Sequence, residues 1–185
     1  MGYGYWFCFY VDDIDFLPSK AQFEGVLEIY SKHQFTTLSY PPKDEESPSY
    51  AQSIKIKESI ENFDWEEMNI DYIFSVEIPI YAKFFEQFLE EYFQNFQTVH
   101  GEGPYDVGIS LWRDPINSPI SGPDEFNYGS HFALLDFHFG MAYEWDLDYI
   151  ELEKLGKIFL VTYKDLINEL SAFLGKDFDF AFIYG

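Results

Sequence analysis

Apolar residues along this chain often recur at every second position or in short runs, which is the pattern of β-strands. The N-terminal run is aromatic and ends at Asp12 and Asp13, so it predicts a buried strand. Five further segments show the pattern, and the last of them closes the chain. The predicted strands are residues 3–11, 35–40, 72–80, 105–111, 131–139 and 178–184.

Apolar positions spaced by three or four residues predict amphipathic helices. The first helix begins after Ser19, because Ser19 and Gln22 have the arrangement of a capping box. The strongest helical pattern spans residues 81–97. A further helix follows residues 162–165, which also resemble a capping box, and it ends at Gly175, a residue typical of helix C-caps.

Two segments fit both kinds of structure. Residues 53–57 alternate like a strand, whereas Ile56, Ile60 and Phe63 have helical spacing. For residues 51–69 we favour a short strand that runs into a helical turn. Residues 143–149 alternate like a strand, although a helix beginning near position 147 fits as well.

One stretch of sequence is echoed later in the chain. Residues 23–30 and 85–92 share the pattern F-E-x-x-L-E-x-Y, and the same register places 14–16 over 76–78. A duplicated βαβ unit would produce this echo, but unrelated amphipathic helices share such patterns, and we favour that explanation. With 185 residues and no long linker, the chain is expected to form a single domain, residues 1–185. The predicted fold is α+β, with a mixed or antiparallel sheet packed by about three amphipathic helices.

The composition is strongly acidic, and the charge is unevenly distributed. The formal net charge is −22, and residues 58–153 hold 21 acidic side chains but only two basic ones. Because like charges repel, nucleic acid and anionic membranes are disfavoured as partners. Arg113 is the only arginine, which argues against a phosphate site built on guanidinium groups. High solubility explains the net charge equally well, but it does not explain why the charge is concentrated in one stretch.

The single cysteine and the N-terminus indicate an intracellular protein. Cys8 excludes an internal disulfide and lies in an apolar run, so we expect a buried, unreactive thiol. The N-terminal run lacks a preceding basic region and soon meets three aspartates, unlike a secretory signal. No apolar stretch has the length of a membrane span. We therefore expect a cytoplasmic protein.

Candidate catalytic residues are few. The chain contains no phosphate-binding loop, no dinucleotide-binding glycine motif and no nucleophile elbow. On the predicted strand 131–139, Asp136 and His138 share one face with about 7 Å between their Cβ atoms, and His131 falls on the other face. That spacing suits two metal ligands, or a carboxylate that orients an imidazole. Polar residues on a half-exposed strand are the commoner explanation.

Two groups of carboxylates have structural explanations as well. Asp12, Asp13 and Asp15 follow the first strand, where carboxylates line a site in some sheets, but they suit a turn before a helix equally well. The acidic row at 144–148 would hold Ca²⁺ or Mg²⁺ only if neighbouring groups added oxygen ligands, and otherwise it discourages pairing at a sheet edge. We favour a structural role for both groups.

Acidic and aromatic residues are interleaved at 62–68 and at 143–149. Carboxylates steer a basic partner toward a surface, and aromatic rings anchor it there. The alternative is a set of core aromatics flanked by exposed acids. The residues that we predict to bind a partner are Asp64, Trp65, Glu66, Glu67, Glu144, Trp145, Asp146 and Asp148.

These features leave three hypotheses for the function. The favoured one is a non-enzymatic acidic protein that captures a basic protein partner without a cofactor, most concretely an immunity-type inhibitor of a bacterial toxin. Its similarity to such inhibitors is one of composition only. The second is a metal-dependent enzyme that uses Asp136 and His138 with a carboxylate cluster. The third is an inhibitor that mimics nucleic acid and competes with DNA for an enzyme.

Overall fold

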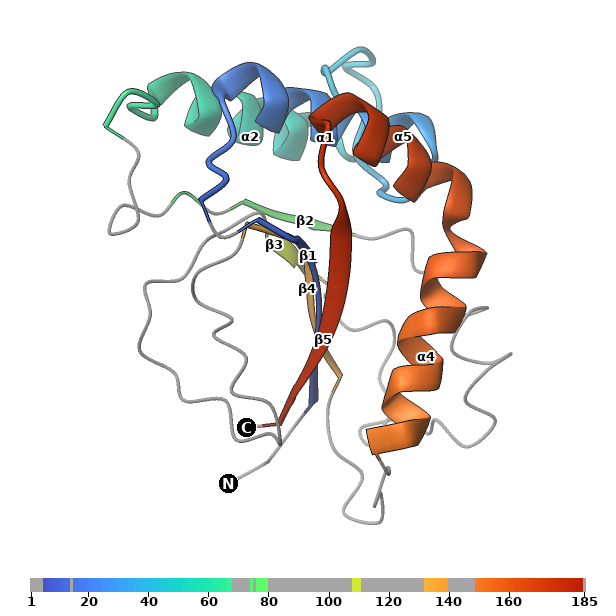
Figure 1. Cartoon of the computed structure of the whole chain (residues 1–185). Coiled ribbons are helices and arrows are strands. Elements are labelled where there is room, and N and C mark those ends of the chain that lie inside the picture. The colour runs from blue at the N-terminus through green and yellow to red at the C-terminus, as the bar shows by residue number, and fades with distance from the viewer. Residues whose placement is uncertain are drawn as a thin grey trace.

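The computed structural model describes residues 5–13, 15–67, 74, 76–79, 108–110, 132–139 and 149–184. Within these residues, helices and strands form the predicted α+β arrangement (Figure 1). The helix predicted at 81–97 and the ambiguous residues 143–148 lie outside the described residues.

Three strands form an antiparallel sheet with the N-terminal strand at its centre (Figure 1). β1 (Tyr5–Val11) pairs with β4 (Ala133–Phe139) on one side and with β5 (Phe178–Tyr184) on the other. The sequence predicted all three strands. Since Tyr5 pairs with Tyr184, the sheet brings the two ends of the described chain side by side.

A second, two-stranded antiparallel sheet consists of β2 (Glu77–Pro79) and β3 (Gly108–Ser110). Each strand lies inside a longer predicted strand. Val76 and Ile78 are buried and Glu77 is exposed, so the predicted alternation is confirmed at these positions.

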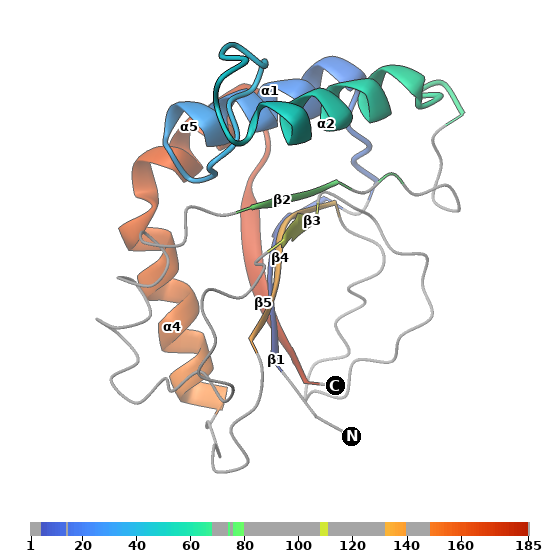
Figure 2. The same ribbon diagram turned by 180° about the vertical axis from the view of Figure 1, so that it is seen from behind.

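The helices lie along the sheets, as the two opposite views show (Figures 1 and 2). α1 (Lys20–Lys32), α2 (Tyr50–Asn62) and α5 (Lys164–Leu174) form one layer above β2. α4 (Tyr149–Thr162) runs beside the three-stranded sheet.

The main core fills the space between these helices and the sheet. Phe9 of β1 lies 5.6 Å from Phe159 of α4 and 5.2 Å from Phe178 of β5, measured between ring centroids. The buried hydroxyl of Tyr30 in α1 donates to the carbonyl oxygen of Leu134 at 2.7 Å. A hydrogen bond therefore joins α1 to β4 in addition to apolar packing.

The opposite face of β1 contributes to a smaller cluster. Cys8 is 0% exposed there and packs with Tyr10 and Ala133, so the predicted burial of the thiol is confirmed. Burial, followed by the charge of Asp179, raises the pKa of the Tyr10 hydroxyl well above its ordinary value.

Both ends of α1 have recognisable caps. The predicted capping box is present, because Gln22 N–H donates to Ser19 Oγ at 3.2 Å and Ser19 N–H donates to Gln22 Oε1 at 2.8 Å. At the C-terminus, Gln34 has a left-handed φ of 54°, and Phe35 N–H donates to the Tyr30 carbonyl at 3.0 Å. This is the pattern of a Schellman motif, with glutamine in the position that glycine usually occupies.

The strand predicted to begin at residue 51 is wrong, because this segment forms α2. Ser53, Ile56 and Ile60 are buried at spacings of three and four residues, which places them on one face of a helix. The alternation that predicted a strand spans only residues 53–57 and does not include Ile60. Burial of the helical face decided the outcome.

The strand predicted at 35–40 does not form either. Phe35, Thr36, Leu38 and Tyr40 are all buried, so burial in this segment is not confined to one face of a strand. Thr36 makes an isolated bridge. Its hydroxyl and the Thr37 N–H both donate to the carbonyl oxygen of Pro79 in β2. We call residues 33–38 the strap, since they connect the end of α1 to β2.

The capping box predicted at 162–165 is also wrong. Tyr163 occupies the N-cap of α5 without a side-chain cap, and its own N–H donates to the Phe159 carbonyl of α4. The buried ring of Tyr163 joins the two helices where a separate start was expected. The predicted C-cap is confirmed, because Gly175 has a left-handed φ of 63°.

The duplicated βαβ unit is not confirmed. Residues 15 and 16 form no strand, although their counterparts at 77 and 78 lie in β2. The counterpart of α1, residues 85–92, lies outside the described part of the chain.

Candidate functional site

The acidic segment, residues 58–67, comprises the end of α2 and the chain that follows it. Its five acidic side chains are all exposed, and it contains no lysine or arginine. Lys57 precedes the segment, with its Nζ 3.9 Å from Glu61 Oε1. An ion pair of this length in water neutralises little of the charge. The five residues are Glu58, Glu61, Asp64, Glu66 and Glu67.

Asp64 fixes the path of the chain after α2. Its Oδ1 accepts hydrogen bonds from the backbone N–H groups of Glu66 at 3.2 Å and of Glu67 at 3.3 Å. This is an Asx turn, in which an aspartate side chain takes the place of a backbone carbonyl. The carboxylates of Glu66 and Glu67 are therefore displayed on a defined turn.

Trp65 attaches the same turn to the core. Its Nε1 donates to the Ile60 carbonyl at 2.8 Å, which satisfies an acceptor left open at the end of α2. Its ring centroid lies 5.3 Å from Phe23, 4.9 Å from Phe63 and 5.2 Å from Phe74. Trp65 is thus a half-buried member of an aromatic cluster, flanked by exposed acids.

Carboxylates from α1 extend the negative surface. The Tyr40 hydroxyl donates to Glu24 Oε1 at 3.4 Å. Burial, followed by the charges of Glu24, Glu61 and Glu28, raises the pKa of Tyr40 well above its ordinary value of 10.0. Since Glu24 and Glu28 belong to α1 and Glu61 to α2, the negative potential spans both helices.

Of the three carboxylates after β1, that of Asp13 has structural partners, which agrees with the favoured interpretation for this residue. Asp13 Oδ1 accepts the Asp15 N–H at 3.0 Å, and Asp13 Oδ2 lies 2.5 Å from Lys176 Nζ. Lys176 also lies over the Phe16 ring, 5.4 Å from its centroid. Asp13 therefore holds the turn before α1 and joins it to Lys176, two residues before β5.

The structure places the alternative pair in β4. Asp136 pairs with Cys8 of β1, and His138 pairs with Trp6. Because directly paired residues of antiparallel strands lie on the same face, the register places Cys8, Asp136 and His138 on one face of the sheet. Within the side chains that the structure describes, no group of three or more His, Cys, Asp or Glu residues is suited to a metal ion.

Half of the predicted binding residues can be located. Asp64, Trp65, Glu66 and Glu67 lie together on the turn after α2. The predicted residues that lie outside the described part of the chain are His131, Glu144, Trp145, Asp146 and Asp148.

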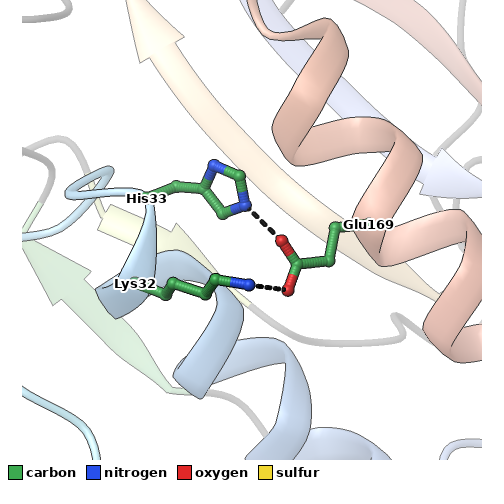
Figure 3. Close-up of polar contacts among 3 residues, drawn as sticks. All are labelled: Lys32, His33 and Glu169. Carbon is green, nitrogen blue, oxygen red and sulfur yellow. Dashed lines mark hydrogen bonds and ion pairs between the residues drawn. The ribbon is translucent and has the colours of Figure 1, made fainter.

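A polar cluster that no sequence pattern predicted joins α1 to α5 (Figure 3). Lys32 Nζ lies 2.7 Å from Glu169 Oε1, and His33 Nε2 lies 2.6 Å from Glu169 Oε2. The hydrogen bonds from Lys32 and then His33 lower the pKa of Glu169 below its ordinary value of 4.5. The partners are 137 and 136 residues apart, so no local spacing could have revealed them.

No protein-family model, curated protein or solved structure matches this chain. Among the described helices, none has the length and apolar character needed to cross a membrane. The fold and the described surface define a class of protein only, an α+β protein whose acidic surface spans α1, α2 and the turn after α2.

Proposed function

We propose that this chain is a non-enzymatic protein that binds a basic protein partner through the acidic segment. The observation that carries the proposal is the exposure of all five carboxylates of residues 58–67 on a stretch without a basic residue. The turn set by Asp64 and the hydrogen bond of Trp65 support it further, because a surface held in one conformation loses less entropy on binding.

Electrostatic steering is the physical basis of this function. A field of one sign raises the rate at which an oppositely charged protein arrives. Dissolved salt screens this field at distances beyond about 10 Å. The carboxylates of α1 add to the field of the acidic segment around Tyr40. The most concrete partner is a small basic bacterial toxin, which this protein would inhibit in the manner of an immunity protein.

The test compares two variants of equal charge. Glu58→Gln with Glu66→Gln neutralises two exposed carboxylates of the acidic segment, and Glu45→Gln with Glu46→Gln neutralises two exposed carboxylates beyond the other end of α2. The association rate is measured against the basic protein encoded by the neighbouring gene, at rising salt concentration. We expect the first variant to slow association about tenfold and the control to leave it nearly unchanged.

Two outcomes would contradict the proposal. One is the absence of any salt-dependent binding to the basic neighbour. The other is an equal effect of both variants, which would show that net charge rather than the acidic segment attracts the partner.

A metal-dependent enzyme is the second candidate, and the β1–β4 register favours it. The pairing of Cys8 with Asp136 adds a third residue of a metal-binding type to the face that carries His138. Thiolate, imidazole and carboxylate are all zinc ligands. The purified protein would then contain metal in elemental analysis and would lose it in His138→Ala, whereas His33→Ala in α1 would retain it. A metal-free protein after refolding with zinc would refute this candidate.

A further inference from the structure

The clamp, which consists of Lys32, His33 and Glu169, is enclosed to different degrees on its two sides. The Lys32 side chain is 68% exposed, whereas those of His33 and Glu169 are 24% and 34% exposed. Water therefore screens the lysine contact more than the histidine contact. Of the two contacts, the one to His33 is better placed to hold α1 against α5 (Figure 3).

His33 lies where a positive charge on its imidazole would interact with the end of α1 and with Glu169. Histidine is the side chain that ordinarily gains or loses a proton between about pH 5 and pH 8. His33 is the C-cap of α1, where the open carbonyl groups of the helix favour a positive charge. Its Nε2 lies 2.6 Å from a carboxylate oxygen. Both features place negative or partly negative oxygen atoms next to the imidazole.

The charged groups that flank the His33–Glu169 contact along α1 and α5 are of both signs. α1 contributes Lys32 and, one turn earlier, Glu28, while the strap residues 34–38 contribute no charge. α5 contributes Glu169 and, one turn before it, Asp165. Lys32 repels a proton on His33, but it donates to the other oxygen of Glu169 and lies mostly in solvent.

We propose that the clamp is a pH-responsive contact between α1 and α5. A proton on His33 turns its hydrogen bond with Glu169 into an ion pair, so the two helices are held more tightly in mild acid than above the range in which histidine titrates. His33 also begins the strap, whose Thr36 and Thr37 bond to Pro79. This inference does not depend on the proposed binding function.

A double-mutant cycle measures the effect. The full chain, His33→Gln, Glu169→Gln and the double variant are unfolded in urea, which leaves the ionic strength unchanged, at about pH 5.5 and about pH 8. Glutamine keeps a polar group at each position but does not titrate. We expect the coupling, expressed as a ratio of unfolding equilibrium constants, to be about two- to fivefold larger at the lower pH. The other histidines titrate in all four proteins, so their contributions cancel.

A matched cycle provides the control. In the His33→Gln background, Lys32→Gln replaces a lysine, which ordinarily keeps its charge throughout this range, so its coupling to Glu169 should be the same at both pH values. In addition, the protonation midpoint of His33, followed by NMR, should move to lower pH in Glu169→Gln. A His33–Glu169 coupling that is independent of pH, or that is larger at the higher pH, overturns the proposal. So does an unchanged His33 midpoint in Glu169→Gln.

Discussion

Two helical glycines lie beneath aromatic rings, and they make a matched test of the packing. A Cβ atom at Gly156 of α4 would lie 2.0 Å from the ring of Phe180, and one at Gly25 of α1 would lie 2.1 Å from the ring of Phe173. Each ring must therefore move when alanine is introduced. Phe180 belongs to β5 and packs against the main core, whereas Phe173 is 44% exposed and can turn toward solvent.

The two alanine variants should differ in stability for this reason. Replacing glycine by alanine in a helix gains about 1 kcal/mol, and forcing extra volume into a packed core costs about 1–3 kcal/mol. For Gly156→Ala the ring is confined, so we place the packing cost in the upper part of this range, at about 2–3 kcal/mol, and expect a net loss of about 1–2 kcal/mol. For Gly25→Ala the ring is free to turn away, so we expect a free energy of unfolding within about 0.5 kcal/mol of the parent.

Unfolding in urea measures the free energy of unfolding of both variants, provided that its dependence on urea concentration has the same slope as in the parent. Phe180→Leu replaces the confined ring by a smaller side chain. In the Gly156→Ala background, it should recover part of the lost stability if the clash causes that loss. If Gly156→Ala is as stable as the parent, or less harmful than Gly25→Ala, the packing of α4 on β5 has been misjudged.

Three further predictions concern single groups. Tyr30→Phe removes the buried donor to the Leu134 carbonyl and should cost about 1–2 kcal/mol, seen as a lower melting temperature, and an unchanged one would place water on that carbonyl. Gln34→Gly removes the cost of a left-handed side-chain residue and should stabilise by about 0.5–1 kcal/mol in urea, whereas Gln34→Ala should not. The lowered pKa of Glu169 means that its carboxylate stabilises the fold above the ordinary value of 4.5 and loses this effect as pH falls below it. The stability difference between the parent and Glu169→Gln should therefore shrink as the pH falls below 4.5, and a difference that grows in that range would contradict the observed partners.

Local sequence patterns correctly predicted those elements that depend only on neighbouring residues. The aromatic run at 5–11, the apolar alternation at 178–184 and the cap formed by Ser19 and Gln22 all lie where they were expected. In each case the deciding information lies within a few residues, because strand periodicity and capping are short-range properties.

Predictions were wrong where packing over a longer range decides. Residues 53–57 alternate like a strand, but Ile60 completes a helical face that is buried in the main core. Residues 35–40 have strand-forming side chains, yet Phe35 and Leu38, three positions apart, are both buried in the main core. Tyr163 is buried between two helices, so α4 continues almost directly into α5.

For the candidate site, the amino-acid sequence determined the amount and position of the negative charge, because charge follows directly from composition. Tertiary structure decided how that charge is displayed. Trp65 became part of an aromatic cluster that supports the turn, and Asp64 became the residue that shapes it. Tertiary structure also brought Lys32 and His33 to Glu169 and placed Cys8 opposite Asp136. Contacts between residues more than one hundred positions apart depend on how helices and strands pack, and no local pattern encodes them.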